Sequence, residues 1–454
     1  MATANISSNP LASELPPLPS YTINPLPPLI PGVPDAYIAL ALPVIGYWVV
    51  SGIFHFIDIY DLFPQYRLHT PAEITSRNKV GRWEVFRAVI IQQVIQTVVG
   101  LMFSWTDPPA MYGKEDYDVA VWAQRIRLAQ RAVPAVLGIV GLNANGLASK
   151  YLKTQPMLSG VLAGGKYPWV TQLIESDGIS QIVPAFTGWE MGLAKAIYWA
   201  IIPSIQFVAA LLIMDAWEYF WHRAMHLNKW LYATFHSHHH RLYVPYAYGA
   251  LYNHWFEGFL LDTCGAGVGY LLTGMTTRQT FWFFTFSTIK TVDDHCGYAL
   301  PWDPLQHITS NNAAYHDIHH QSWGIKTNFS QPFFIFWDRW MGTRWNGDVK
   351  LRYERDRAVA EKKIAEWKRK AESGESSDSS IPIVLVEQDS DFNASEEVTD
   401  DSRALSEGKE NQPVGRRSPR KRQTADAGLK GLRERVGGGI HGRGSGLLDM
   451  EGSR

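Results

Sequence analysis

The sequence predicts an all-α fold, an integral membrane helical bundle with a histidine-rich cap for two metal ions and a disordered C-terminal tail. Three segments are apolar over roughly the 20 residues that a helix needs to cross a bilayer. Of the 15 histidines, eight fall in three short clusters at metal-ligand spacing. Beyond about residue 350 the chain becomes highly polar, which separates a tail from the apolar body.

Composition excludes several classes of protein. The formal net charge of −1 gives no field that favours nucleic acid, so no nucleic-acid partner is expected. The two cysteines, Cys264 and Cys296, lie outside any CxxC pattern and cannot form a disulfide framework. The first basic residue is Arg67, so the N-terminus lacks the basic region of a cleavable signal peptide.

The chain begins with a Pro-rich segment, residues 1–35, which is expected to be extended. Residues 36–215 are expected to form membrane helices and their connecting loops. The candidate spans are 37–54, 86–105 and 194–214, the last with an expected kink at Pro203. The second span contains three glutamines that are costly in lipid and are therefore expected to face other helices. They are Gln92, Gln93 and Gln96.

Three shorter segments separate the second and third spans. Residues 117–131 have the periodicity of an amphipathic helix. Residues 132–145 are apolar but short and contain Pro, Gly and Asn, so a re-entrant or interfacial segment is expected rather than a crossing. Residues 150–193 are expected to be a polar loop with short helices. Further on, 256–275 and 280–292 are apolar on either side of a polar break, which predicts a helical hairpin that dips into the membrane.

The clustered histidines form the boxes HRAMH, HSHHH and HDIHH. In a helix, positions i, i+3 and i+4 share one face, so each HxxHH box is expected to project three imidazoles the same way. One metal ion does not need so many imidazoles, which indicates a two-metal site. All-imidazole ligation suits iron, zinc or copper and disfavours calcium or magnesium. The eight residues are His222, His226, His236, His239, His240, His316, His319 and His320.

A lone histidine is more often a solvated or core residue, but three boxes at this spacing favour metal binding. Asp215 and Glu218 share the helical face of His222 and His226. Two interpretations of these carboxylates stay open. They are either acceptors for imidazole N–H groups, which would fix the tautomers, or a polar helix end.

The charges of the loops predict the topology. The loop 62–85 is basic, whereas no Lys or Arg precedes the first span, so the positive-inside rule places this loop in the cytosol. Two further crossings bring 222–240 to the same side, provided that 132–145 does not cross fully. The metal site is therefore expected to face the cytosol. Of the sequons at Asn5, Asn328 and Asn393, only Asn5 would be lumenal.

The end of the chain is charged throughout. Residues 346–371 are expected to form a charged helix with i,i+4 ion pairs. Its basic excess could attract an anionic lipid surface or an acidic partner, or the helix could simply be solvated. Residues 372–454 are rich in Ser, Glu, Asp, Gly and Arg, which predicts disorder.

The metal site and the membrane together favour one kind of chemistry. Two irons held by neutral imidazoles can bind and reduce O2, and the oxidising species must then be shielded from water near an unreactive C–H bond. A site at the cytosolic face of an apolar bundle can do this for a lipid, with the polar head at the interface and the tail in the bundle. The pattern therefore favours hydroxylation or desaturation of a lipid.

The three boxes, which follow a hydrophobic helix, resemble the fatty acid hydroxylase superfamily of integral membrane di-iron enzymes. The flanking segments resemble one branch more closely, the sphinganine C4-hydroxylases. These segments are HRLYVPYAYGALYNHWFEG (240–258), TIKTVDDHCGY (288–298), NNAAYHDIHHQ (311–321) and TNFSQPFFIFWDR (327–339). FPQYRLHTPAE (63–73) and RWEVFRAVIIQQVIQT (82–97) resemble the fungal members. The resemblance covers roughly residues 20–345, and within it 216–345 is the expected catalytic region.

The resemblance implies hydroxylation of carbon 4 of sphinganine or dihydroceramide to phytosphingosine or phytoceramide, in the endoplasmic reticulum membrane. It implies O2 as oxidant and a di-iron cofactor, although zinc could replace iron in the same cage. Electrons are expected from NAD(P)H through cytochrome b5 and its reductase. The sequence contains no His-Pro-Gly-Gly haem motif, so cytochrome b5 is expected to be a separate protein that docks on the basic surface 339–370.

The resemblance also extends the ligand set. His254 and His295 fall in matching segments and are added to the eight box histidines, which are also expected to be catalytic. His238 is left out, because position i+2 faces away from the other three on a helix. His307 is a weaker candidate. The histidines expected not to bind metal are His55, His69 and His441.

Two other functions stay open. A sterol C4-methyl oxidase or C5-desaturase shares the histidine boxes, and only the flanking segments favour the sphingoid base. A metal-binding membrane transporter is expected to carry polar residues along several spans, whereas here the clusters lie at helix ends.

Overall fold

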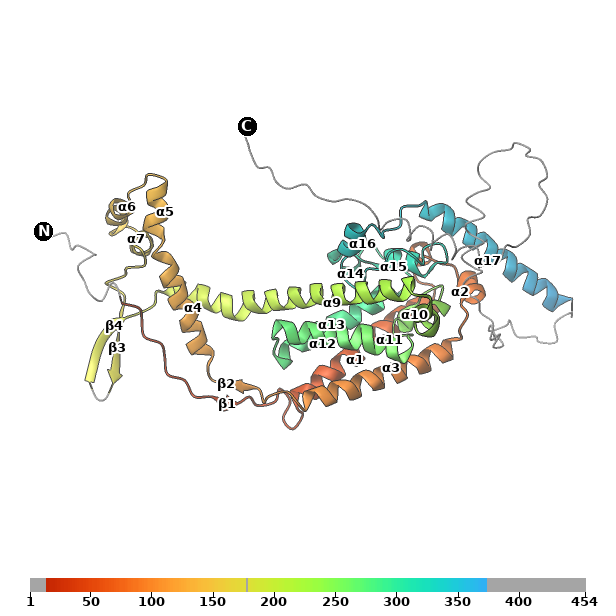
Figure 1. Cartoon of the computed structure of the whole chain (residues 1–454), viewed down its shortest axis with the longest axis horizontal. Coiled ribbons are helices and arrows are strands. Elements are labelled where there is room, and N and C mark those ends of the chain that lie inside the picture. The colour runs from red at the N-terminus through yellow and green to blue at the C-terminus, as the bar shows by residue number, and fades with distance from the viewer. Residues whose placement is uncertain (1–13, 177–178, 374–454) are drawn as a thin grey trace, which may run out of the picture. The chain divides into compact units, whose positions relative to one another are not determined.

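A computed structural model describes residues 14–176 and 179–373 of the chain (Figure 1). These residues are mostly helical, with two small antiparallel two-stranded sheets. The all-α expectation therefore needs a small correction. The predicted tail lies outside the described residues from position 374 onward, as do residues 1–13 of the Pro-rich segment.

Three helices are long and apolar enough to cross a membrane, at the places that the sequence predicts. They are α1 (Asp35–Ile59), α3 (Arg82–Ser104) and a 40-residue helix, Gly188–Leu227. Apolar side chains on them point outward: Val49 is 55% exposed, Val94 56% and Ile205 62%. Such exposed apolar surface is expected where lipid, rather than water, surrounds a helix.

The 40-residue helix consists of α8 (Gly188–Ala196), a π turn η4 (Ile197–Ile201) and α9 (Ile202–Leu227). The π turn lies directly before Pro203, where the sequence predicts a kink. Proline has no backbone N–H and its ring crowds the preceding turn, so a wider turn accommodates it.

Two of the three glutamines of α3, Gln92 and Gln93, are buried against other parts of the chain, as predicted. Gln93 accepts a hydrogen bond from the Trp48 indole of α1 at 2.8 Å. Gln92 donates to Asp262 at 3.4 Å and lies against Gly258, where a Cβ atom would come within 1.5 Å of the Gln92 amide nitrogen. A larger residue at 258 would therefore displace the Gln92 side chain.

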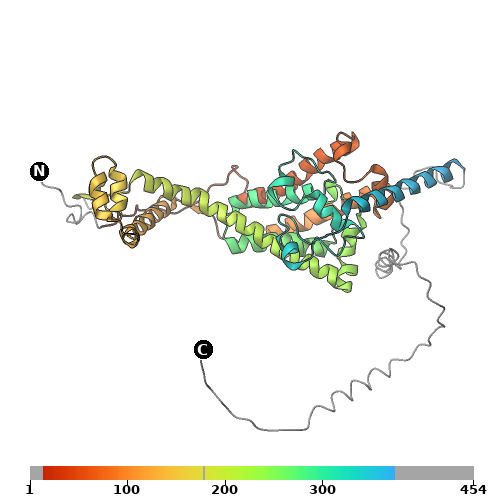
Figure 2. The same ribbon diagram turned by 90° about the horizontal axis from the view of Figure 1, so that it is seen from above.

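The apolar stretches beyond residue 255 form the predicted helical hairpin. Its first arm consists of α11 (Trp255–Gly258), a π turn η7 (Phe259–Thr263) and α12 (Cys264–Thr273), and its second arm is α13 (Thr277–Asp294). Gly274 in the left-handed conformation ends α12, and a Thr276 capping box begins α13. The arm α12 packs against α9, and α13 packs against α1 (Figures 1 and 2).

The segment between α3 and α8 contains α4 (Glu115–Gln130), the predicted amphipathic helix, followed by α5 (Val133–Ile139), α6 (Ala144–Tyr151) and α7 (Pro156–Leu162). The chain bends by 114° between α5 and α6, which fits either a broken span or a re-entrant segment, so whether 132–145 crosses the membrane stays a prediction.

The loop expected at 150–193 instead contains a β-hairpin, β3 (Thr171–Ser176) paired antiparallel with β4 (Ile179–Pro184). The sequence signal for it is the Asp-Gly pair at 177–178, between two segments that contain β-branched residues. The second sheet pairs β1 (Asn24–Pro25) with β2 (Met111–Tyr112).

The remaining elements gather around the C-terminal end of α9 (Figure 1). They are η3 (Pro64–Tyr66), α2 (Pro71–Arg77), α10 (Lys229–Thr234), η5 (His236–Arg241), η6 (Ala247–Gly249), α14 (Leu305–Ile308), α15 (Ala313–His320), α16 (Phe336–Met341) and α17 (Val349–Glu372). The last is the predicted charged helix, and it packs on α2. Together these elements form the histidine-rich cap.

Candidate metal centre

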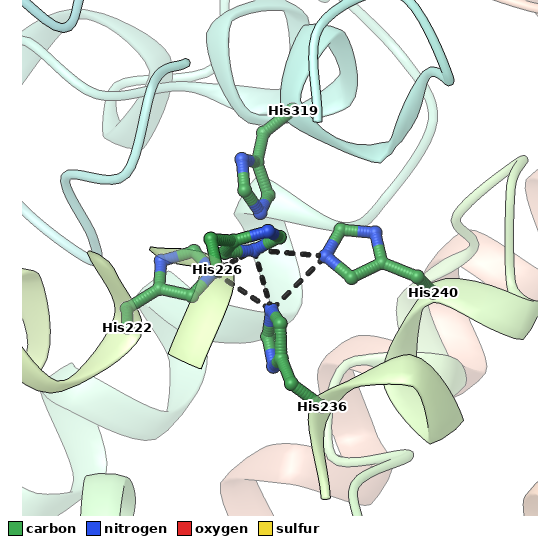
Figure 3. Close-up of side chains that lie close together, drawn as sticks. All are labelled: His222, His226, His236, His240 and His319. Atoms are coloured by element: carbon green, nitrogen blue, oxygen red, sulfur yellow. Dashed lines mark hydrogen bonds between the residues drawn. The ribbon is translucent and has the colours of Figure 1, made fainter. Parts of the chain in front are cut away.

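Nine buried histidines meet in the cap in two groups. The five-histidine group consists of His222, His226, His236, His240 and His319 (Figure 3). The four-histidine group consists of His239, His295, His316 and His320. Within each group the ligand atoms all lie within 4.8 Å of one another. The structure therefore offers two metal positions, as the count of imidazoles predicts.

Each HxxHH box is divided between the two groups. The first and last histidines of a box lie in one group and the middle histidine lies in the other, so His236 and His240 meet while His239 turns away. The expectation that three imidazoles of a box project the same way is therefore wrong. On α15, consecutive residues differ by about 100° around the helix axis, which lets His319 and His320 face different groups. The second box is a 3-10 helix rather than an α-helix.

Most of the rings are held by their Nδ1 atoms. In six of the nine, Nδ1 lies 2.5–3.1 Å from an oxygen that accepts a hydrogen bond, which is a backbone carbonyl in five cases and the Glu257 carboxylate in one. Nδ1 therefore carries the proton, and Nε2 is left as the metal-binding atom. The pairs are His222 with Phe329 O, His236 with Glu257 Oε1, His239 with Tyr252 O, His295 with Thr291 O, His319 with Thr327 O and His320 with Leu242 O.

The Nε2 atoms converge on one another. In the five-histidine group, the closest Nε2–Nε2 pairs among His222, His226, His236 and His240 run from 2.7 Å between His226 and His236 to 3.3 Å between His222 and His226 (Figure 3). In the four-histidine group they are 3.1 Å between His295 and His316 and 3.2 Å between His316 and His320. Two unprotonated nitrogens at this distance repel each other unless a cation lies between them. Nitrogens bound to one metal at about 2.1 Å and at right angles lie about 3 Å apart, so both groups fit a metal ion.

The protonation state also suits metal binding. Burial lowers the pKa of His236 and His295 to about 3 and that of His239 to about 4, with neighbouring imidazoles adding to the effect for His295. These rings are therefore neutral at physiological pH, and neutral imidazole is the form that binds metal.

The structure does not bring His254 to either group. Its Nδ1 accepts a hydrogen bond from the Phe256 N–H at 3.2 Å, so the ring caps α11 and is only partly buried. His238, which was left out, packs its ring against Tyr252 at a centroid distance of 4.4 Å. His307 is exposed and bonds to the Pro301 carbonyl. His55 and His69 lie outside both groups, and His441 lies outside the described residues.

The carboxylates that fix the rings differ from those proposed from the sequence. Asp215 accepts hydrogen bonds from the backbone N–H groups of Phe333 and Phe334 at 2.9 and 2.8 Å, and so positions the chain that follows the cap rather than an imidazole. The carboxylate that holds a ring is Glu257, which the helical-face argument missed. The available signal was that Glu257 is an ionisable residue within a largely apolar segment. In a membrane protein such a residue indicates a functional site.

One cavity adjoins both groups. His236 of the five-histidine group lines it, and so do three members of the four-histidine group. The other polar lining residues are mainly acidic, and they come from α9, from the hairpin and the turn before it, and from the loop before α16. They are Glu218, Asn253, Glu257, Asp262, Thr291, Asp294 and Gln331. A reacting molecule in this cavity would lie next to both metal positions.

Comparison with known proteins gives a consistent result. Residues 207–343 match the fatty acid hydroxylase family, a range that contains all nine histidines of the two groups. The chain is 40% identical to the sphingolipid C4-hydroxylase SUR2 of Saccharomyces cerevisiae, over 76% of this chain and 82% of the yeast protein. It is 42% identical to the sphingolipid C4-hydroxylase of Schizosaccharomyces pombe, over 67% of this chain and 87% of that protein.

A plant relative is similar over the same part of the chain. The sphinganine C4-monooxygenase 1 of Arabidopsis thaliana is 36% identical, over 68% of this chain and 88% of the plant protein. No solved structure matches the chain.

Proposed function

Because the chain belongs to the fatty acid hydroxylase family and its relatives are sphingolipid C4-hydroxylases, we propose that it is a membrane monooxygenase that hydroxylates carbon 4 of a sphingoid base. The observation that carries the proposal is the pair of buried histidine groups that share one cavity. The catalytic region in this proposal is 216–345, and the metal ligands are the nine histidines of the two groups.

Iron is the metal that fits the proposed reaction. The ligand atoms are all imidazole nitrogens, which iron, zinc and copper accept, but zinc has no redox chemistry and cannot supply electrons to O2. A bound iron pair supplies the reduction of O2 and the transfer of one oxygen atom to carbon. Overall, one O2, two electrons and two protons convert C4–H into C4–OH and water.

The residues of the chain prepare the site for this chemistry. Backbone carbonyls and Glu257 fix the rings before metal binds, so little ordering is required at that step. The histidines of both groups are almost fully buried, which keeps bulk water from the metal positions. The cavity holds the substrate beside them.

The electrons are proposed to come from NAD(P)H through cytochrome b5 and its reductase. Cytochrome b5 would dock on the basic surface 339–370, which includes α17. Lys362 of this helix is exposed, whereas Lys363 donates a hydrogen bond to the Ser76 carbonyl at 3.1 Å and lies over the Trp367 ring. Charge reversal at Lys362 is therefore the sharper test of docking. Unchanged turnover at limiting cytochrome b5 would count against it.

The proposed location is the endoplasmic reticulum membrane, with the metal site facing the cytosol. The apolar helices support a multi-pass membrane protein. The basic loop 62–85 supports the orientation, because it lies on the same side as the cap, to which its Lys79 N–H and Leu68 N–H are hydrogen-bonded.

The test is turnover by the purified protein loaded with iron and supplied with cytochrome b5, its reductase, NADH and 18O2. We expect sphinganine to become a 4-hydroxy base that carries one 18O atom, as measured by mass spectrometry. Parallel reactions receive a 4-methylsterol and a C5-saturated sterol. Oxidation of a sterol with sphinganine unchanged would replace our proposal by the sterol oxidase or desaturase alternative. Metal that exchanges freely and supports no oxidation would favour the transporter.

A further inference from the structure

The position of carbon 4 constrains how a substrate sits in the cavity, if the proposed function is correct. Sphinganine carries its amine on carbon 2 and hydroxyls on carbons 1 and 3. The amine nitrogen and carbon 4 are separated by three bonds, so they are no more than about 4 Å apart. The head group must therefore enter the cavity with carbon 4. A head group that stays at the membrane interface, as the sequence suggested, does not fit this geometry.

Two carboxylates in the cavity wall have no cationic partner among the described residues. Glu218 lies on α9 and is 3% exposed, and its Oε1 atom has no hydrogen-bond partner. Asp262 lies on η7 and receives only long hydrogen bonds, at 3.4 Å from Gln92 and 3.5 Å from Asn253. Both carboxylates line the same cavity, Glu218 from α9 and Asp262 from η7.

The other acidic residues of the cavity are already partnered. Asp294 forms a buried ion pair with Lys290 and accepts a hydrogen bond from Asn311. Glu257 binds the Nδ1 atom of His236 at 2.5 Å. Glu218 and Asp262 therefore remain as the pair in this cavity that is suited to bind an incoming cation, because burial of a carboxylate without a cationic partner is unfavourable.

We propose that Glu218 and Asp262 bind the ammonium group of a free sphingoid base and thereby hold carbon 4 beside the two metal positions. The substrate class that follows is the free base rather than its N-acylated form. In a dihydroceramide the nitrogen is a neutral amide, so its binding leaves both carboxylates without a cation. This deepens the proposed function and rests on it.

The experiment uses the full-length protein loaded with zinc, which binds substrate without turnover, and the iron-loaded protein for rates. The variants are Glu218→Gln and Asp262→Asn, which keep the shape and remove the charge. Asp107→Asn is the control, since Asp107 is exposed and lies outside the cavity. The two probes are sphinganine and N-acetylsphinganine, measured by equilibrium binding and by kcat/KM. Metal content is measured in every preparation.

We expect Glu218→Gln and Asp262→Asn each to weaken sphinganine binding at least about tenfold, the effect typical of losing a charged hydrogen-bond partner. Binding of N-acetylsphinganine should change less than about threefold, and the control should bind both probes as the parent does. The loss in kcat/KM should arise mainly from KM, with two metal ions retained.

Three outcomes would overturn the inference. If the variants weaken the binding of both probes equally, the carboxylates do not distinguish the charged amine from the neutral amide. Loss of metal in the variants would show that the two carboxylates serve instead to offset the charge of the metal ions. Turnover of N-acetylsphinganine alone by the parent protein would reject the free base while leaving the proposed function intact. If the parent hydroxylates neither probe, the proposed function itself fails.

Discussion

His239 and His240 are neighbours in the chain, yet their imidazoles belong to different groups. The same is true of His319 and His320. Each HxxHH box therefore bridges the two metal positions, and the spacing between the positions is set by the backbone of two short segments. A single substitution within a box should empty one position while the other keeps most of its ligands.

The adjacent pair His238 and His239 gives a matched test. Replacement of His239 with Ala removes one ligand of the four-histidine group, so we expect the metal content to fall from two ions per chain to about one, with hydroxylation lost. His238→Ala should keep both ions and full activity, because its ring packs on Tyr252 outside both groups. Metal analysis of the purified variants and turnover of sphinganine measure this. Full activity of His239→Ala would remove it from the ligand set.

The site histidines were largely predictable from the sequence. The spacing within the boxes and the family resemblance of the flanking segments select the nine residues that form the two groups in the structure. His254 was selected on the same grounds, but its ring caps a helix, a role that histidine rarely takes. The partners of the Nδ1 atoms were not predictable. Phe329, Tyr252 and Leu242 contribute backbone carbonyls, which every residue possesses, so only the fold decides which ones face an imidazole.

At the scale of elements, a buried polar network ties α2, α15 and α17 together. His69 lies between two carboxylates, with Nδ1 2.9 Å from Glu73 of α2 and Nε2 2.9 Å from Asp317 of α15. The Tyr353 hydroxyl of α17 donates to the same Asp317 at 2.5 Å. Burial opposes protonation of His69, but the two carboxylates outweigh it and raise its pKa to about 9. Protonated His69 thus links the loop 62–81 to the histidine cap.

This network predicts a pH dependence of stability. The pKa of His69 rises from 6.5 to about 9 on folding, so its contribution is complete below pH 6.5 and is lost as the pH rises through 9. The loss is on the order of 3 kcal/mol. The pKa of Glu73 is lowered to about 2, mainly by His69 against the effect of burial, so its contribution is lost only below pH 4.5. This network should therefore contribute most to stability between pH 4.5 and 6.5.

Thermal unfolding of the detergent-solubilised protein between pH 6 and 10 measures the effect, with His69→Gln as the comparison. Glutamine can bond to one carboxylate but does not titrate, so the variant should be less stable at pH 6 and should show a flatter profile above pH 6.5. A parent profile that is as flat as that of His69→Gln would contradict the proposed protonation of His69.

Elements that follow from hydrophobic length were predicted well, whereas those that depend on pairing were not. The spans α1 and α3 and the hairpin α12–α13 appear in the sequence as apolar runs of sufficient length. A helix in lipid satisfies its own backbone hydrogen bonds, so an apolar run of that length is enough to predict it. The strands β3 and β4 are six residues each, and their stability comes from the ladder between them. The Asp-Gly pair at 177–178 was the one signal for that pairing, and without it 150–193 was interpreted as a polar loop with short helices.

At the scale of the whole molecule, the three helices of the described residues that are long and apolar enough to cross a membrane would divide the connecting segments between two sides. The loop 62–81 is bonded to the cap through the Lys79 N–H and Arg241 carbonyl at 2.9 Å and the Leu68 N–H and Gly297 carbonyl at 3.0 Å. The segment 105–187 lies between α3 and α8. An odd number of crossings therefore separates it from the loop 62–81 and from the cap. If 62–85 is cytosolic, then 105–187 is lumenal and the cap is cytosolic.

Two single substitutions create glycosylation sites that report this arrangement, in a background where Asn5→Gln removes the predicted lumenal sequon. Asn145→Ser completes a sequon at the exposed Asn143, whose side-chain oxygen can still accept from Gly146 N–H and cap α6 after a glycan is attached to its nitrogen. Asp348→Thr completes one at the exposed Asn346, and threonine can replace Asp348 in capping the first turn of α17. We expect a glycan at Asn143 and none at Asn346, detected as an endoglycosidase-sensitive change in mobility.

The two sites separate the orientation of the chain from the number of crossings. A glycan at Asn346 alone would invert the orientation but keep the two segments on opposite sides, so the basic loop would then not determine the topology. Glycans at both sites would place Asn143 and the cap on the same side, which would contradict the arrangement of three crossings. A cytosolic cap matters for function, because a soluble reductase domain can deliver electrons only to a metal site on its own side of the membrane.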